Sequence, residues 1–350
     1  MTQQREFSMD ILRVLACFLV IWQHASENYY ISPEGLPVKE LSTYTIGYIT
    51  SLDRCCVALF IIISGYFLLP VSQPLSTFFK RRLARIAGPF VVWGIIYAIY
   101  FIFSKGDSIT QCLTNIANIP INFGTDLGHM WYVYMLLGLY LLAPVISPWL
   151  KIASHKVLLF YLGIWFVASN LPYIHLIFPE IWGECFWNPT PMLYYFTGFV
   201  GYFILGFYFR RFGSLSPLVS VVFIIIGYFV TALVYNSRIS TAETVASLEL
   251  SWGECNSNVI LMAAGIFSLV KSVKWHRDNF LGNFITDFAT KGYAIYLAHV
   301  LILTEVSKVV VGKHDSVLLE VPAISLATFI LTYLLIKFLS CLPKSRYWLG

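Results

Sequence analysis

The stretch MDILRVLACFLVIWQHASEN, residues 9–28, is mostly apolar apart from a few ionisable side chains. A helix of about 20 such residues crosses the roughly 30 Å hydrocarbon core of a bilayer. Comparable apolar stretches follow at 45–70, 87–104, 129–148, 157–178, 192–209, 217–236, 256–272, 290–311 and 320–341. The sequence therefore predicts an all-α integral membrane protein with about ten transmembrane helices.

The composition supports the same class of protein. Of the 350 residues, 58% are hydrophobic and 12% are charged, and the mean hydropathy is +0.73. Soluble domains have about 45–50% apolar and about 25% charged residues, so a water-soluble globule, a disordered chain and a fibrous repeat are excluded. The net charge of +5 comes from short basic clusters between apolar runs, which indicates membrane topology and not nucleic-acid binding. The seven cysteines match no zinc-binding spacing, so no metal is expected.

The basic residues also predict the orientation of the chain. If the N-terminus is cytoplasmic, the cytoplasmic segments carry 14 of the 23 lysines and arginines, and the opposite loops carry most of the acids. The positive-inside rule therefore places both termini in the cytoplasm, in agreement with an even number of spans. The first stretch is expected to be a retained span, because Asp10 and Arg13 interrupt the apolar core that a cleaved signal needs. Without a linker or a long loop, residues 1–350 are expected to form one transmembrane domain.

Three ionisable residues of the first stretch form a polar stripe along one helix face. Arg13 and His24 are eleven residues apart, which is about three turns plus 20°, and Asp10 lies about 40° to the other side of His24. The stripe extends about 21 Å along the helix axis. Ionisable residues within a span usually face the protein interior and mark a functional pathway. The alternative is that Asp10 pairs with Arg13 near the interface while His24 is satisfied separately.

Polar residues of the second stretch allow two readings as well. Arg54 lies near its outer end and could pair with Asp53 or extend to the interface, or it could hold an anionic or polyhydroxylated ligand. Ser64 and Gly65 form a small-residue pair that lets another backbone or a slender ligand approach closely.

The next predicted cytoplasmic segment contains four cations within six residues: Lys80, Arg81, Arg82 and Arg85. Guanidinium groups bind phosphate through two parallel hydrogen bonds, so this cluster could hold a phosphorylated ligand. Contact with lipid headgroups is the alternative.

Two later segments carry histidines among aromatic residues. His129, Trp131 and Tyr132 open the fourth stretch, where an interfacial aromatic belt is the usual explanation. Tyr293, Tyr296 and His299 recur at intervals of three in the ninth stretch, and His299 is expected near mid-span, where a belt does not explain it. A further pair at this spacing, Glu305 and Lys308, is expected near the outer end.

The four-residue sequence Trp-Gly-Glu-Cys occurs twice in predicted outer loops, at 182–185 and 252–255. Because the outer compartment is oxidising, we expect a disulfide between Cys185 and Cys255. The aromatics Trp182, Phe186, Trp187 and Trp252 could stack on sugar or anchor the loops at the interface.

Five motifs, in this order and on a chain of about ten spans, resemble the acyltransferase 3 family of bacterial membrane O-acyltransferases. The motifs are Asp10-x-x-Arg13 followed by ten residues and His24, Phe60-x-x-x-Ser64-Gly65-Tyr66, Arg82-x-x-Arg85-Ile86-x-x-Pro89, His129-x-Trp131-Tyr132, and Tyr293-x-x-Tyr296-Leu297-x-His299. The arrangement particularly resembles that of stand-alone members that acetylate surface polysaccharides. It departs from the family pattern at Ala58, where a proline is often found, and at Gly88.

The resemblance implies an acyl-CoA donor, with acetyl-CoA the commonest, that enters from the cytoplasm, and a glycan or lipid-linked saccharide hydroxyl as the acceptor on the periplasmic side of a bacterial inner membrane. It assigns His24 as the catalytic histidine and Arg13 as its family partner. Arg82 and Arg85 are expected to hold the CoA phosphates, with Lys80 and Ser64 as further donor-binding residues. The other polar positions expected near substrate, or in supporting roles, are Asp10, Arg54, Trp131, Tyr132, Tyr296 and His299.

A neutral histidine suits the role of general base because its ordinary pKa of about 6.5 is close to working pH. Asp10 is too far along the helix to contact His24, whereas Glu27 at the i+3 position is a candidate carboxylate partner. A secondary transporter remains the main alternative, because intramembrane Asp, Arg and His also build proton relays. The acyl group, the acceptor, the choice between direct transfer and an acyl-histidine, and assembly as a homo-oligomer stay open.

Overall fold

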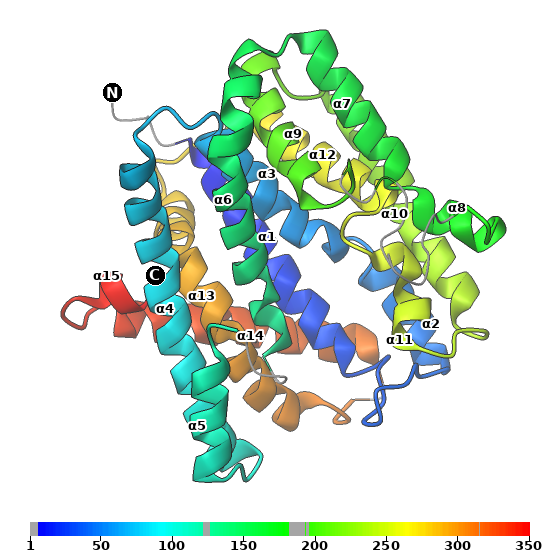
Figure 1. The fold of residues 1–350 in the computed structure, drawn as a ribbon. Coiled ribbons are helices and arrows are strands. Elements are labelled where there is room, and N and C mark those ends of the chain that lie inside the picture. The colour runs from blue at the N-terminus through cyan, green and yellow to red at the C-terminus, as the bar shows by residue number, and fades with distance from the viewer. Residues whose placement is uncertain (1–5, 122–126, 182–192, 194–195, 315) are drawn as a thin grey trace.

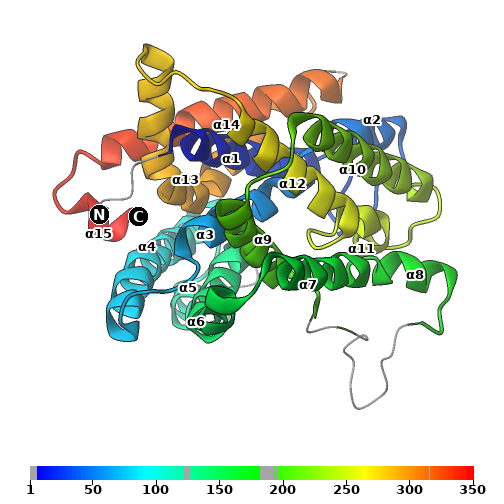
Figure 2. The same ribbon diagram turned by 90° about the horizontal axis from the view of Figure 1, so that it is seen from above.

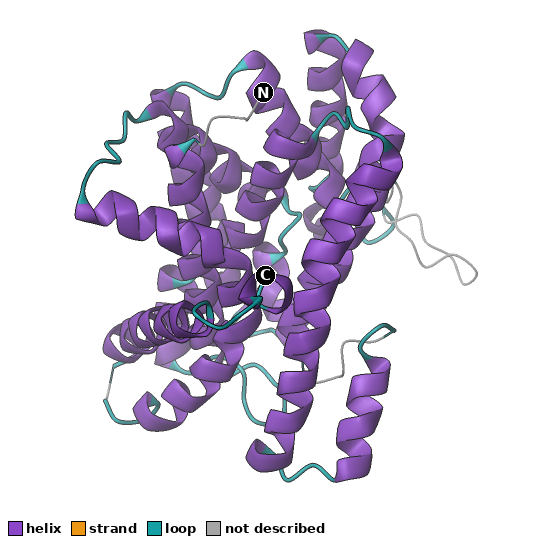
Figure 3. Cartoon of the chain, turned by 90° about the vertical axis from the view of Figure 1, so that its left-hand side faces the viewer, coloured by secondary structure: helices purple, strands orange, loops and turns teal. Residues whose placement is uncertain are grey.

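The computed structural model describes residues 6–121, 127–181, 193, 196–314 and 316–350. Within these ranges the chain is helical, and the only strand-like contact is an isolated bridge between Ile31 and Pro37 (Figures 1 and 3). The α-helices are α1 (Phe7–Glu27), α2 (Leu41–Ile49), α3 (Cys56–Leu68), α4 (Leu75–Ser104), α5 (Ile109–Asn118), α6 (Trp131–Ile152), α7 (His155–Ala168), α8 (Leu171–Ile177), α9 (Phe199–Phe212), α10 (Pro217–Arg238), α11 (Val245–Leu248), α12 (Ser257–Ser272), α13 (Phe280–Val310), α14 (Val317–Leu339) and α15 (Ser345–Trp348). Three short 3₁₀ helices accompany them: η1 (Asp53–Cys55), η2 (Gly128–Met130) and η4 (Glu249–Trp252).

Seven segments of the described chain are long and apolar enough to cross a membrane: α1, α4, η2 with α6, α7 with α8, α10, α13 and α14. Two bent pairs bring the number to nine, α2 with η1 and α3 at 48°, and α11 and η4 with α12 at 43°. The protein is therefore an all-α, multi-pass membrane protein, as the sequence predicts.

One of the ten expected spans, the sixth at 192–209, does not form a full span among the described residues. The helix found there is α9, which has 14 residues. At 1.5 Å per residue it extends about 21 Å, less than the hydrocarbon core. Residues 192, 194 and 195 lie outside the described residues.

Helix α1 lies at the centre of the molecule. It packs against α3, α12, α13 and α14, so protein surrounds this helix on several sides (Figures 1 and 2). Helices α1 and α4 both begin in the upper half of Figure 1 and run toward the lower edge. The upper edge is the side that the sequence predicts to be cytoplasmic.

Helices α3 and α9 approach each other through glycines. A Cβ atom on Gly65 would lie 1.9 Å from the carbonyl oxygen of Phe203, and one on Gly206 would lie 2.0 Å from that of Ile62. No side chain fits at either position, which confirms that the Ser64-Gly65 pair admits a neighbouring backbone.

The breaks in the two bent spans lie next to each other and next to the last turn of α1. Thr50 Oγ1 donates a hydrogen bond to Ser26 Oγ of α1 at 2.8 Å, and Trp252 Nε1 donates to Ser51 Oγ at 3.3 Å. Ser26, Thr50 and Ser51 are completely buried. The three segments therefore form one hydrogen-bonded junction around the end of α1.

Candidate active site

His24 lies in the last turn of α1, beside a carboxylate from the same helix. Its Nδ1 atom is 2.8 Å from Oε1 of Glu27. The His24 side chain is 21% exposed and that of Glu27 is 39% exposed. The i+3 spacing thus brings together the pair suggested by the sequence. A carboxylate at Nδ1 favours the tautomer that carries a proton on Nδ1, which leaves Nε2 free to accept one.

His299 lies beside the His24 ring, and His129 lies beside His299. The ring centroid of His299 lies 5.4 Å from that of His24 and 5.4 Å from that of His129. His299 Nδ1 is 2.5 Å from the carbonyl oxygen of Tyr296, so the proton of His299 lies on Nδ1. The Nε2 atoms of His299 and His129 are buried and have no hydrogen-bond partner among the described residues. We call His24, His129 and His299 the histidine cluster.

The surroundings of His129 differ from those that the sequence predicts. His129 is buried, as is Tyr132, so an interfacial aromatic belt does not describe these two residues. Trp131 is half-buried and packs against Phe199 at a centroid distance of 5.5 Å. His129 was absent from the expected site residues, although its place in the His-x-Trp-Tyr motif was a signal for it. Within the described residues, no group of three or more His, Cys, Asp or Glu is arranged to hold a metal ion.

At the other end of α1, Arg13 and Asp10 form an ion pair. Arg13 Nη1 is 2.9 Å from Asp10 Oδ1, and the Asp10 side chain is buried whereas that of Arg13 is 32% exposed. The pairing that the sequence offered as an alternative is therefore present. It does not exclude a second role for Arg13, because the same side chain also lines a cavity.

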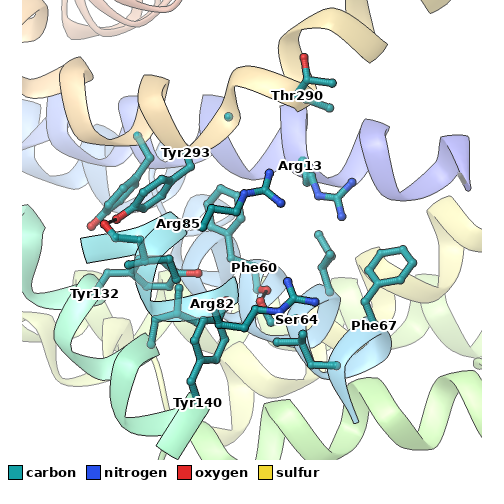
Figure 4. A pocket seen from close by; sticks show the side chains of 17 residues that line it. Arg13, Phe60, Ser64, Phe67, Arg82, Arg85, Tyr132, Tyr140, Thr290 and Tyr293 are labelled. Atoms are coloured by element: carbon teal, nitrogen blue, oxygen red, sulfur yellow. Dashed lines mark hydrogen bonds between the residues drawn. The ribbon is translucent and has the colours of Figure 1, made fainter. Parts of the chain in front are cut away.

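This cavity, which we call the arginine cavity, has a volume of about 230 Å³ and lies between α1, α3, α4, α6 and α13. The guanidinium groups of Arg13, Arg82 and Arg85 face a shared space (Figure 4). Hydroxyl-bearing residues complete its polar lining: Ser64, Tyr132, Tyr140, Thr290, Tyr293 and Tyr296. Three cations and several hydroxyl groups around one cavity suit an anionic, phosphorylated ligand.

The cavity brings together about half of the expected site residues. Arg13, Ser64, Arg82, Arg85, Tyr132 and Tyr296 all line it. Lys80 is exposed on α4 and is not among the lining residues. His24 and His299 lie beyond the cavity, on the far side of Tyr296.

A second, much smaller void separates the arginine cavity from the histidine cluster. It is lined by Cys17, Val20, Ile21, Ile295, Tyr296 and His299. Tyr296 lines both spaces. The void has no room for a water molecule.

Arg54 has partners of its own near the outer end of the second span. Its Nε is 3.2 Å from Asp53 Oδ1, its Nη1 is 4.0 Å from Glu249 Oε1, and its guanidinium lies 3.6 Å from the centre of the Trp252 ring. Only 3% of Arg54 is exposed, so its side chain does not extend to the interface. The pairing with Asp53, one of the alternatives that the sequence left open, is present. Trp252 is 3% exposed and stacks on arginine inside the protein, so it is not an anchor at the interface.

Acidic residues missed by the sequence analysis gather around Arg54. Tyr30 Oη donates a hydrogen bond to Glu249 at 2.6 Å, and burial raises the pKa of the Tyr30 phenol well above its usual value, so it remains a donor. Glu254, at the break before α12, interacts electrostatically with Arg54 and His24. Only the Trp-Gly-Glu-Cys repeat pointed to this segment in the sequence.

Two remaining expectations concern the outer side of the protein. Glu305 and Lys308 form the expected pair at 2.8 Å. Cys185, Trp182, Phe186 and Trp187 lie outside the described residues, so the Cys185–Cys255 disulfide stays a prediction.

Comparison with known proteins adds one match. The family model Acyl_transf_3, described as an acyltransferase domain, matches residues 6–337. No curated protein and no solved structure matches this chain. The matched range contains every helix from α1 to α13 and nearly all of α14.

Proposed function

Because this chain belongs to the acyltransferase 3 family, and is therefore a membrane acyltransferase, we propose that it moves an acetyl group from acetyl-CoA to a hydroxyl of a glycan or lipid-linked saccharide on the opposite side of a bacterial inner membrane. The donor enters the arginine cavity from the cytoplasm. The acceptor hydroxyl approaches His24 from the periplasm. The N-terminus is then cytoplasmic.

One observation carries this proposal. The arginine cavity lies at one end of α1, and the His24–Glu27 pair lies at the other end of the same helix. Arg13 and His24 are separated by about 16 Å along α1, at 1.5 Å per residue. An anionic carrier with a long neutral arm fits this arrangement, because the charged groups can remain with the arginines while the thioester reaches toward the histidine.

In the arginine cavity, Arg82 and Arg85 bind the phosphates of CoA through charge-assisted hydrogen bonds. Arg13, held by Asp10 at 2.9 Å, is positioned to contact the donor nearer the membrane interior. Apolar lining residues such as Phe60 and Leu136 provide a surface for the pantetheine arm.

At the other end, His24 acts as the general base. Glu27 holds the proton on Nδ1, and Nε2 takes the proton from the acceptor hydroxyl as its oxygen attacks the thioester carbonyl. The tetrahedral intermediate collapses, the C–S bond breaks, and the CoA thiolate receives the proton from His24. An ester and free CoA are the products, so atoms and charges balance without a metal.

The test uses the full chain in lipid nanodiscs, with acetyl-CoA binding and CoA release as separate measurements. We expect His24→Ala to bind acetyl-CoA but to release CoA about 100-fold more slowly or worse, since a general base accelerates a reaction by about 10²–10⁴. Arg82→Ala should weaken acetyl-CoA binding by about tenfold, the loss of one charge-assisted contact of about 1.4 kcal/mol. Lys80→Ala, a cation on the same helix outside the cavity, is the matched control and should bind like wild type.

If the wild-type protein binds no acyl-CoA, the proposed donor is wrong, and the flux of small solutes should be measured instead. If Lys80→Ala weakens binding as much as Arg82→Ala, the binding is a general effect of surface charge and not a property of the cavity.

A further inference from the structure

Tyr296 lies in the wall between the arginine cavity and the histidine cluster. Its side chain lines the arginine cavity on one side and the small void beside His299 on the other. Any group that moves directly from the arginines to His24 along this wall has to pass Tyr296.

The Tyr296 side chain is held in its place between the two spaces. Its Oη donates a hydrogen bond to the backbone carbonyl of His129. Its ring lies 5.2 Å from the ring of Tyr132 and 5.7 Å from that of His299, and the residue is 8% exposed. One hydroxyl contact and a set of ring contacts therefore keep the wall closed.

The groups behind Tyr296 are arranged to receive a ligand. The Nε2 atoms of His299 and His129 are buried and have no partner among the described residues, and that of His299 is an acceptor because its proton lies on Nδ1. Buried polar atoms are almost always hydrogen-bonded in native proteins. The pantetheine arm of CoA carries amide N–H groups, which are suitable donors for such acceptors.

We propose that Tyr296 is a movable partition that admits the acyl end of the donor to the histidine cluster and limits it to short acyl groups. This inference rests on the proposed function, because it names the residue that decides which acyl-CoA is used. When the ring swings aside, the void and the arginine cavity become one channel.

The limit on acyl size follows from the walls of the void. Cys17, Val20 and Ile21 of α1 face Ile295 and His299 of α13, and the void between them holds no water while Tyr296 is in place. The space available to an acyl group is therefore essentially the space that the tyrosine ring vacates. An acetyl group, with three heavy atoms, fits the space of a phenol ring with seven, whereas an octanoyl group, with nine, exceeds it.

Cys17 provides a test that does not depend on acyl transfer. It lines the void but not the arginine cavity, is 3% exposed, and its thiol contacts the carbonyl oxygen of Gly292, a residue of the cavity wall, at 3.8 Å. Because the ring has to swing aside only part of the time, we expect a small methanethiosulfonate reagent to modify Cys17 slowly in the wild-type protein. In Tyr296→Ala, peptide mapping by mass spectrometry should show modification of Cys17 at least tenfold faster.

Tyr140→Ala is the matched control, because Tyr140 lines the arginine cavity but not the void. It should leave Cys17 protected. Tyr296→Phe removes only the hydroxyl contact with His129 and should produce modification at an intermediate rate, which keeps the test available if Tyr296→Ala does not fold. Equal protection of Cys17 in both Tyr296 variants, or equal modification in Tyr140→Ala, would refute the partition.

The acyl limit is tested with acetyl-, butyryl- and octanoyl-CoA and CoA release as the readout. We expect the wild-type protein to prefer acetyl-CoA to octanoyl-CoA, and Tyr296→Ala to reduce this preference at least tenfold. If Cys17 becomes reactive but the preference does not change, Tyr296 is not the size limit. If the wild-type protein uses no acyl-CoA, the proposed function fails, while the Cys17 result still decides whether Tyr296 separates the two spaces.

Discussion

Replacing Glu27 with glutamine removes the negative charge beside His24 but preserves the length of the side chain and one acceptor oxygen. The wild-type contact is 2.8 Å long between His24 Nδ1 and Glu27 Oε1. Its loss should make the imidazolium that forms during proton transfer less stable, and so should lower kcat. The KM for acetyl-CoA should stay the same, because Glu27 is not among the residues that line the arginine cavity.

The magnitude follows from the exposure of the two side chains. Hydrogen bonds to charged groups contribute about 1.5–3 kcal/mol when protected from water, and exposed ion pairs contribute about 0–1 kcal/mol. With His24 at 21% and Glu27 at 39% exposed, the contact falls between these classes, and we take about 1–2 kcal/mol. At 1.36 kcal/mol per factor of ten, kcat should fall by about 5- to 30-fold.

The assay is steady-state release of CoA by full-length protein in lipid nanodiscs. Glu34→Gln is the control, because Glu34 is an exposed acid in the loop that follows α1. A Glu27→Gln variant with wild-type kcat would show that the carboxylate does not support the base. A loss as large as that in His24→Ala would show that Glu27 reacts directly, and either result would refute the reasoning.

Two predictions concern stability and are checked by thermal unfolding followed through tryptophan fluorescence. Gly65→Val should lower the unfolding midpoint, because its Cβ would lie 1.9 Å from the backbone oxygen of Phe203 and overpacking costs about 1–3 kcal/mol or more. Gly138→Val, which has open space around it, should leave the midpoint unchanged. Equal effects of the two substitutions would contradict the packing argument. Arg54→Met should destabilise the protein by about 3–5 kcal/mol because it leaves the buried Asp53 carboxylate without its cation. The double variant with Asp53→Asn should recover part of that loss, and no recovery would show that the pair is not the cause.

Hydropathy predicted the helices to within a few residues where the whole helix is apolar. The stretch 217–236 corresponds to α10 at Pro217–Arg238, and 9–28 corresponds to α1 at Phe7–Glu27. Where a helix continues outside the apolar region, its start was misplaced. Helix α4 begins at Leu75 instead of 87, and α13 begins at Phe280 instead of 290. Hydropathy reports the part of a helix suited to hydrocarbon, whereas the backbone hydrogen bonds continue into the polar turns.

The candidate site divides in the same way between local and distant contacts. Pairs within one helix, such as Asp10 with Arg13 and Glu305 with Lys308, follow from helical spacing and were predictable. The approach of His299 to His24 depends on how α13 packs against α1, and no spacing in the sequence encodes that packing. The arginine cavity combines residues of five helices, so its members were predictable only through the family resemblance.

The two broken spans have a consequence for the energy of a charge at His24. Free backbone amide and carbonyl groups at a helix break cannot face lipid, so they require protein or water around them. At Thr50, Ser51 and Trp252 the breaks are bonded to each other and to the last turn of α1. The imidazolium that the proposed function requires at His24 would therefore form beside Glu27 and the polar side chains of this junction, where an ion is solvated better than in hydrocarbon.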